Sequence, residues 1–253
     1  MRHPRSLGAP RPASRGASTT VRHVRTSKPT LRPQTTTLWD YPSQHYGTGL
    51  QGDPNYVGAT PSYVIWNLLQ RYTRPGDLVV DPMCGSGTTL DVAAELDRRA
   101  RGFDVQPYRE DIEQADARAL PLRDRSVDFV FIDPPYGDHI DYGGAPDCIG
   151  KLSAMEEPFF EALDAVIFEA HRLLETNRHI ALYACDFFNK KQGFAPIGAR
   201  LMANVCSYFE PIDHVCVVRH NKGLKKGNWH QAAERDNFFL RGFNHLIIGK
   251  KID

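Results

Sequence analysis

The stretch Phe-Ile-Asp-Pro-Pro-Tyr-Gly at 131–137 places an acid, two prolines and an aromatic ring directly after an apolar run, 127–132. The prolines remove two backbone donors and fix two φ angles, so the expected strand ends there. Asp133 and the carbonyl of Pro134 can accept hydrogen bonds from an exocyclic amino group, and Tyr136 can stack on a flat base. Fixed acceptors would aim the amino lone pair at an electrophile without a strong base. The expected catalytic residues are Asp133, Pro134, Pro135 and Tyr136.

A second stretch, Asp81-Pro82-Met83-Cys84-Gly85-Ser86-Gly87-Thr88-Thr89, lies between an expected strand at 78–81 and an expected helix at 89–99. Glycines there let the backbone approach a ligand and turn sharply into a helix N-terminus. Asp104 ends the next expected strand about twenty residues on, where an acid can bind ribose hydroxyls. No lysine follows the glycines, so this is not a P-loop, and the third glycine of the dinucleotide fingerprint is absent. A tight turn of any α/β protein is the alternative.

Three further features carry weaker signals. Asp116 and Ala117 follow a short expected strand, and Asp116 could accept a hydrogen bond from an adenine amino group; a simple turn or helix cap explains them as well. Cys84 lies inside the glycine-rich turn, and without a partnering base nearby it is interpreted as a small turn residue rather than a nucleophile. The ten histidines show no metal-ligand spacing, so no metal site is expected.

The glycine-rich turn followed by Asp-Pro-Pro-Tyr resembles the S-adenosylmethionine-dependent amino-methyltransferases, the N-4 cytosine and N-6 adenine DNA methylase family. The resemblance covers roughly residues 58–142. It implies a Rossmann-like class I methyltransferase fold and S-adenosyl-L-methionine as cofactor. In that family the turn binds the methionine part, the acid after the second strand binds ribose, and Asp-Pro-Pro-Tyr holds the target amino group. By position, the expected cofactor-binding residues are Thr60, Pro61, Asp81, Met83, Cys84, Gly85, Ser86, Gly87, Thr88, Thr89, Asp104, Asp116 and Ala117.

The resemblance implies methyl transfer to an exocyclic amino group of a nucleic-acid base, with DNA as the first expectation. An aspartate before the two prolines is more typical of adenine N6 enzymes than of cytosine N4 enzymes. The same order of motifs also resembles the tRNA guanine-N2 methyltransferases, so an RNA methyltransferase is the alternative. A catalytically silent binding subunit of the same fold is a third interpretation, which the intact Asp-Pro-Pro-Tyr disfavours.

Only 137–154 and 219–243 could serve as a target-recognition region, since no large separate domain is left over. Asp138, His139 and Tyr142 could line the target pocket, although a polar loop explains them equally. The second region interleaves basic and aromatic side chains, which suits a splayed-out nucleotide; a solvated loop is the alternative. The expected nucleic-acid-binding residues are Lys222, Lys225, Lys226, Trp229, Arg235 and Arg241. A specificity partner or a homodimer would enlarge so small a surface.

Strands and helices are expected to alternate along the body, which predicts a mostly parallel, doubly wound α/β sheet. No clear helix separates the last two strands, so they are expected to form an antiparallel pair. The expected helices are 61–73, 89–99, 155–175 and 196–209, and the expected strands are 78–81, 101–105, 127–132, 179–185, 213–220 and 244–251.

The composition fits one methyltransferase domain over residues 37–253, with 41% hydrophobic and 24% charged residues in a chain of 253. Five cysteines without a CxxC spacing indicate a reducing, cytoplasmic compartment, and no apolar run approaches the roughly 20 residues of a membrane span. Residues 1–36 are expected to be a disordered basic tail, because residues 1–38 hold eight basic and no acidic side chains. A solvated tail, a polyanion-binding arm and an organelle transit peptide all fit that composition.

Overall fold

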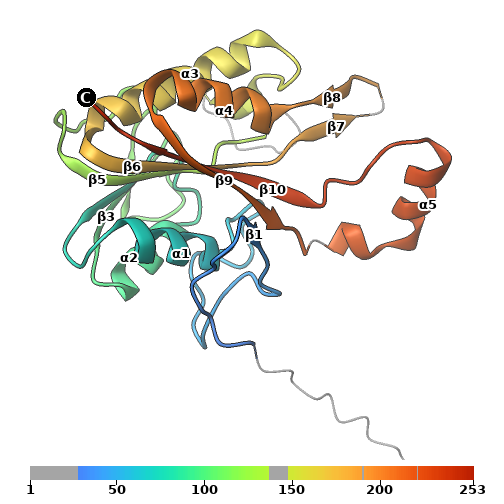
Figure 1. The fold of residues 1–253 in the computed structure, drawn as a ribbon, viewed down its shortest axis with the longest axis horizontal. Helices are drawn as coiled ribbons and strands as arrows, with labels where there is room; N and C mark the ends of the chain where they lie inside the picture. The colour runs from blue at the N-terminus through green and yellow to red at the C-terminus, as the bar shows by residue number, and fades with distance from the viewer. Residues whose placement is uncertain (1–27, 137–147, 190, 221) are drawn as a thin grey trace, which may run out of the picture.

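The computed structural model describes residues 28–136, 148–189, 191–220 and 222–253. An eight-stranded sheet runs through the molecule in the order β1-β9-β10-β6-β5-β2-β3-β4 (Figure 1). Its strands are β1 (Leu38–Trp39), β2 (Leu78–Asp81), β3 (Arg99–Asp104), β4 (Ile112–Gln114), β5 (Val127–Ile132), β6 (Leu174–Ala184), β9 (Glu210–Val218) and β10 (Phe243–Lys250). A separate antiparallel hairpin joins β7 (Phe187–Asn189) to β8 (Gly193–Ala195).

Helices cover both faces of the sheet (Figure 1). On one face lie α1 (Ser62–Tyr72) and α2 (Thr88–Glu95), and on the other lie α3 (Glu157–Leu173) and α4 (Ile197–Tyr208). The side chains of β5 alternate between them, because successive residues of a strand point to opposite faces. Phe129 and Phe131 are buried in the core around α1, whereas Val130 and Ile132 are buried in the core around α3. The apolar run that ends before Asp133 is therefore a central strand buried on both faces.

The sheet has one reversed strand. β10 is antiparallel to both of its long neighbours, β6 and β9, whereas β2, β3, β4, β5 and β6 are parallel to one another. The chain winds outward from β2 through β3 to β4, then returns to add β5 and β6 on the other side. A topological switch point therefore lies between β2 and β5, where ligands of doubly wound folds bind. The predicted mostly parallel sheet with an antiparallel final pair is confirmed.

The structure differs from the expected elements in several places. A short helix η2 (Lys222–Lys225) and a helix α5 (Gly227–Arg235) lie between β9 and β10, where no helix is expected. Helix α5 is short and polar and buries none of its residues, so no core-facing positions in its sequence indicate a helix. α2 ends at Glu95 rather than at 99, and Asp97 adopts a positive φ of 60° that ends helical geometry. The short strand expected before Asp116 is β4, whereas the sequence did not predict β1 or the β7–β8 hairpin, which are short.

The N-terminal stretch at 28–36 contacts the body of the protein. The Gln34 backbone N–H donates to Asn67 Oδ1 on α1 at 2.7 Å, and the Tyr41 hydroxyl donates to the Pro29 carbonyl at 2.9 Å. The remainder of the expected tail, 1–27, lies outside the described residues. None of the helices in the described ranges combines the length and apolar character that crossing a membrane requires.

Candidate active site

A cavity of about 410 Å³ opens at the switch point of the sheet. Three strands beside the cavity have an acid at their carboxyl end. Asp81 is the last residue of β2, Asp104 is the last residue of β3, and Asp133 directly follows β5. These strands are neighbours and parallel, so their carboxyl ends meet at one edge. Residues 55–60, which precede α1, form another wall. The fold thus brings together acids that lie up to 52 positions apart in the sequence.

The glycine-rich turn forms the floor of this cavity. Gly85 and Gly87 adopt positive φ values of 48° and 83°, which glycine tolerates best. A Cβ on Gly85 would lie 3.1 Å from the ring of Tyr56, so the turn also needs the small residue for space. The Gly85 N–H donates to Asp104 Oδ2 at 3.1 Å, which ties the turn to the end of β3.

Asp81 organises the turn from within. Its carboxylate accepts from the Thr89 hydroxyl at 2.5 Å and from the Met83 N–H at 3.0 Å, and the residue is buried. Burial raises the pKa of Asp81 to about 7, against the opposing effect of these hydrogen bonds. The carboxyl group therefore fixes the start of α2.

Asp104 presents its carboxylate to the same cavity. Its two oxygens accept backbone N–H groups from Gly85 and Gln106 at 3.1 and 3.0 Å. Each carboxylate oxygen has two acceptor sites, so each keeps one for a ligand. Burial raises the pKa of Asp104 above its ordinary value. The position suits the binding of paired hydroxyl groups.

Asp133 lines the same cavity at the start of the Asp-Pro-Pro-Tyr turn. The Tyr136 hydroxyl donates to its Oδ1 at 2.7 Å, and the Thr60 hydroxyl donates to its Oδ2. Burial is the main cause that raises the pKa of Asp133 to about 7, and the nearby Asp81 adds to it. Thr60 is one of the expected cofactor-binding residues, and its hydroxyl also ties the cavity wall to Asp133.

Asp116 and Ala117 also line the first cavity. The Arg118 guanidinium holds the Asp116 carboxylate at 2.6 Å, and the Arg118 backbone N–H donates to it at 2.9 Å. Burial raises the pKa of Asp116, but these contacts outweigh it, so the pKa is lowered overall. Asp116 is thus an ionised acceptor at the edge of the cavity.

Most of the residues expected from the sequence line this cavity. They are the four residues of Asp-Pro-Pro-Tyr and Thr60, Asp81, Met83, Cys84, Gly85, Ser86, Thr88, Thr89, Asp104, Asp116 and Ala117. Two of the expected residues lie elsewhere. Gly87 caps α2, and Pro61 lines a second cavity of about 370 Å³ that shares Gly58, Ala59 and Tyr136 with the first.

An aromatic pair beside the glycine-rich turn was not expected from the sequence. The rings of Tyr56 and Tyr108 meet edge to face at 5.1 Å, and both side chains line the first cavity. The Tyr108 hydroxyl donates to Asp53 Oδ2 at 2.6 Å. The only signal in the sequence is the aromatic, turn-rich character of 35–60.

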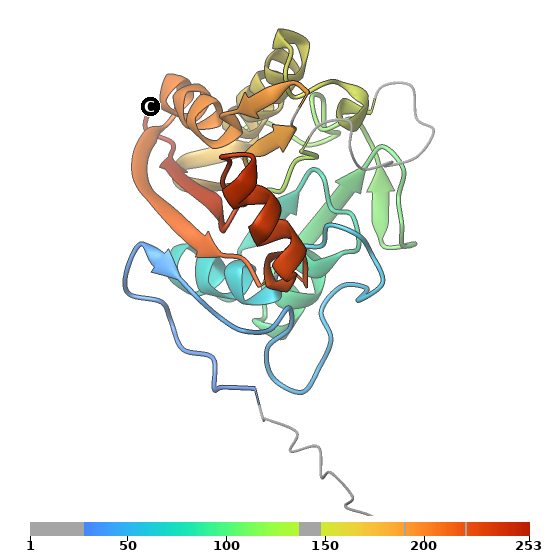
Figure 2. The same ribbon diagram turned by 90° about the vertical axis from the view of Figure 1, so that its right-hand side faces the viewer.

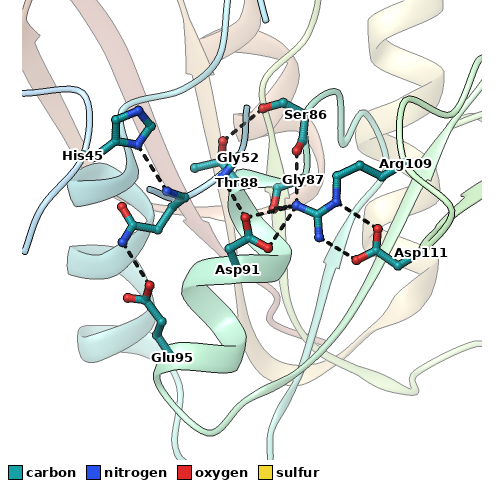
Figure 3. Close-up of polar contacts among 10 residues, drawn as sticks. His45, Gly52, Ser86, Gly87, Thr88, Asp91, Glu95, Arg109 and Asp111 are labelled. Carbon is teal, nitrogen blue, oxygen red and sulfur yellow. Dashed lines mark hydrogen bonds and ion pairs between the residues drawn. The ribbon is translucent and has the colours of Figure 1, made fainter. Parts of the chain in front are cut away.

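An arginine clamps the glycine-rich turn from outside (Figure 3). The Arg109 guanidinium donates to the Ser86 and Gly87 carbonyls at 3.3 and 3.5 Å, and to the Asp91 carboxylate at 2.9 Å. Asp111 holds the opposite edge of the guanidinium at 2.6 Å. A Cβ on Gly87 would lie 2.5 Å from Arg109, so the clamp requires glycine there.

Helix α2, which carries Asp91, also holds the loop that precedes α1 and forms a wall of the cavity (Figure 3). The Gly52 N–H donates to Asp91 Oδ2 at 2.7 Å, and the Gln51 amide donates to Glu95 Oε1 at 2.9 Å. His45 accepts the Gln51 N–H at 3.3 Å. α2 therefore fixes both the floor and one wall of the cavity.

The expected nucleic-acid-binding residues all belong to residues 219–243, which connect β9 to β10 and which we call the arm (Figures 1 and 2). Lys225, Lys226 and Arg235 are exposed, and Trp229 is 49% exposed. Arg241 does not belong to this exposed set: its guanidinium lies over the ring of Phe194 at 5.1 Å and is only partly exposed. The side chain of Lys222 and the loop residues Asp138, His139 and Tyr142 lie outside what the structure describes.

Within the described ranges, no group of three or more His, Cys, Asp or Glu residues could hold a metal ion.

Comparison with known proteins gives a partial family match and a fold. The family model for DNA methylases matches residues 15–115, which include the glycine-rich turn and Asp104 but end before Asp133. A comparison with curated protein sequences found no match.

Solved structures share the fold at low sequence identity. TrmN from Thermus thermophilus has a TM-score of 0.52 and 19% identity over 78% of this chain, and this chain spans half the length of that one. The [4+2]-cyclase SpnF has a TM-score of 0.51 and 13% identity, with 81% and 88% of the two chains covered. The geranyl diphosphate C-methyltransferase of Streptomyces coelicolor A3(2), crystallised with S-adenosyl-L-homocysteine, has a TM-score of 0.49 and 13% identity, with 80% and 85% covered.

At these identities the solved structures show the fold alone, since unrelated chemistries share one fold. Together with the strand order, the two structures with TM-scores above 0.5 confirm a Rossmann-like α/β fold. The resemblance to the DNA methylase family is confirmed by the family match over residues 15–115.

Proposed function

We propose that this protein transfers a methyl group from S-adenosyl-L-methionine to an exocyclic amino group of a nucleic-acid base. The observation that carries the proposal is the position of Asp133: it borders the same cavity as the glycine-rich turn and Asp104. An amino group held by Asp133 would thus lie beside the methyl donor. The match to the DNA methylase family favours DNA as the substrate.

The first cavity fits the proposed cofactor. Its volume of about 410 Å³ lies within the usual range of about 300–1,000 Å³ for small-molecule sites. Asp104 keeps acceptor sites for ribose hydroxyls, and Gly85 lets the ligand approach the backbone closely. Tyr56 and Tyr108 offer aromatic faces for a flat ring. When bound, the cofactor supplies an electrophilic methyl group on a sulfonium.

The chain's own part in the reaction is to position the amino group and to remove a proton. Asp133 keeps one acceptor site on each oxygen beyond the hydrogen bonds from Thr60 and Tyr136, and the Pro134 carbonyl offers another acceptor. Two such acceptors would hold both amino N–H groups and leave the lone pair directed into the first cavity. The pKa of about 7 also suits Asp133 to accept the proton that the methylated nitrogen loses.

The arm is the proposed contact for the nucleic acid backbone and neighbouring bases. Lys225 and Lys226 are exposed cations, Trp229 is half exposed, and Phe239 is 82% exposed. Cations bind phosphates and exposed rings stack on bases, which suits an unpaired or extruded nucleotide. Arg235 contributes less charge to such a surface, because Asp236 binds its guanidinium at 2.8 Å.

The test compares Asp133→Ala with Glu161→Ala. The second variant is the control, because it removes an exposed carboxylate on α3, which does not line the first cavity. Cofactor affinity is measured by calorimetry, and transfer is measured with labelled cofactor on DNA and RNA. Asp133→Ala should bind the cofactor as the wild type does and lose at least about 100-fold in transfer rate; Glu161→Ala should lose neither. Comparable turnover by Asp133→Ala would refute the proposal. Cofactor binding without transfer by the wild type would favour the non-catalytic binding subunit.

A further inference from the structure

We propose that the second cavity holds the target base and that Asn244 and Arg219 select guanine there. The proposal deepens the amino-methyltransferase function above and rests on it. It departs from the adenine that the resemblance favours.

The second cavity adjoins the reaction site directly. It shares Gly58, Ala59 and Tyr136 with the first cavity, and the hydroxyl of Tyr136 donates to Asp133 at 2.7 Å. Tyrosine rings make up much of the remaining wall, at Tyr41, Tyr63 and Tyr183. A volume of about 370 Å³ between aromatic side chains suits a flat heterocycle. A base there would reach Asp133 past Tyr136, while the methyl donor would occupy the first cavity.

Three polar atoms of this wall are buried without a hydrogen-bond partner among the described residues. They are Tyr63 Oη, Arg219 Nε and Asn244 Oδ1. Tyr63 is 1% exposed and Asn244 is 8% exposed. An unsatisfied buried polar group costs about 1–3 kcal/mol, so three in one cavity point to a ligand that supplies the partners.

The burial of Asn244 determines which of its atoms faces the ligand. Its Oδ1 is buried and has no hydrogen-bond partner among the described residues. Asn244 also lowers the pKa of Tyr183, which lines the same cavity, within a larger rise caused by burial. Oδ1 is then left as a fixed acceptor.

Arg219 is fixed at the end of β9 in a similar way. Its guanidinium donates to Cys185 Sγ at 2.7 Å, and its backbone N–H donates to the Gly242 carbonyl at 3.0 Å. These contacts leave the Nε–H as a donor without a partner among the described residues. With Asp133, the base therefore meets two acceptors and one donor.

Only guanine offers the complementary groups. Its Watson–Crick edge carries an amino group, a ring N–H donor and a carbonyl acceptor, which pair by type with Asp133, Asn244 Oδ1 and the Arg219 Nε–H. Arginine is also the usual partner of the guanine carbonyl. The amino groups of adenine and cytosine carry the only N–H donors of those bases, so Asn244 Oδ1 would stay unpaired with either. A site with buried polar groups rejects a ligand that leaves them unpaired.

The experiment first locates the modified base. Wild-type protein is incubated with labelled cofactor and either DNA or RNA, and the nucleosides are resolved by mass spectrometry. The modified position is then varied in a synthetic oligonucleotide as guanine, 2-aminopurine or adenine. 2-Aminopurine keeps the 2-amino group but lacks the ring N–H and the carbonyl of guanine. We expect N2-methylguanine, and transfer to 2-aminopurine slower by at least about 100-fold.

Variants of Asn244 separate recognition from folding. Asn244→Leu removes the acceptor and should lower the guanine to 2-aminopurine rate ratio by at least about tenfold, leaving the part that Arg219 contributes, whereas Asn244→Asp keeps an acceptor and should retain most of the ratio. A merely structural role would lower both rates and leave the ratio unchanged, which would refute the proposal. Methylation of adenine or cytosine by the wild type would overturn the guanine assignment and leave the proposed function standing. No transfer to any base would refute the proposed function itself.

Discussion

Replacing Asp133 with asparagine should stabilise the protein at and above neutral pH while it ends methyl transfer. Burial raises the pKa of Asp133 from 3.8 to about 7, so between these pH values the folded state keeps a proton that the unfolded state releases. Stability of the wild type therefore falls as pH rises through this window, by about 1.4 kcal/mol per pH unit. The full shift corresponds to about 4 kcal/mol, and the contact of Asp133 with an open cavity reduces this to about 2–4 kcal/mol.

Asparagine keeps the shape of the side chain and an acceptor for the Thr60 hydroxyl, but never ionises. Asp133→Asn and the wild type should unfold with similar free energies at pH 4, where both side chains are neutral. At pH 8 the variant should be more stable by about 2–4 kcal/mol.

Urea unfolding at the two pH values measures this difference, and Glu161→Gln serves as the control because its carboxylate is exposed. Equal stabilities of Asp133→Asn and wild type at pH 8, or a difference that does not change with pH, would refute the reasoning. The transfer rate of the wild type should rise with pH and level off above about 7, as Asp133 ionises.

Three further perturbations test the walls of the site and the arm. Gly52→Ala should destabilise the protein and weaken cofactor binding, because its Cβ would lie 2.4 Å from the Thr88 hydroxyl of the glycine-rich turn. The control Gly76→Ala, at a φ of +87° with open space around it, should cost only about 1–2 kcal/mol of stability in thermal unfolding. Arg109→Gln should weaken cofactor affinity about tenfold in calorimetry, a loss of about 1.4 kcal/mol, with kcat unchanged; Arg101→Gln breaks a comparable ion pair away from the cavity and should leave affinity intact. Lys226→Gln should reduce the salt dependence of nucleic-acid binding by about one counterion in fluorescence titrations, and an unchanged slope would exclude it from the contact.

The acids of the site could be predicted because each ends a strand. An apolar run followed by Asp81 or by Asp133 signals a buried strand and the carboxyl end of that strand, and neighbouring parallel strands bring such ends together. The spacing from the glycine-rich turn to Asp104 added the third strand. Local patterns of this kind were sufficient for the strands β2, β3, β5, β6, β9 and β10, for α1 and for the acids of the first cavity.

Features built from distant, unpatterned residues could not be predicted in this way. The second cavity combines Tyr41, Tyr63, Tyr183, Arg219 and Asn244 from the 35–60 loop, α1, β6, the end of β9 and β10. No spacing in the sequence relates these positions, since only the packing of the loop and α1 against the sheet brings them together.

Two local features could not be predicted. The Thr60 hydroxyl reaches Asp133 from a loop whose path the sequence does not specify. The helix α5 escaped prediction because it is short and polar and buries no residue, so no core-facing positions mark it in the sequence.

The position of the transferred methyl group tests the central claim most directly. The wild type and Asp133→Ala are incubated with nucleic acid and S-adenosylmethionine that carries a deuterated methyl group. Product nucleosides are then fragmented by tandem mass spectrometry to locate the label. The account predicts a deuterated methyl group on the exocyclic nitrogen of a single kind of base, and none with Asp133→Ala. Label on a ring carbon, a ring nitrogen or a ribose oxygen would contradict it, because the proposed role of Asp133 and Pro134 is to hold an amino group.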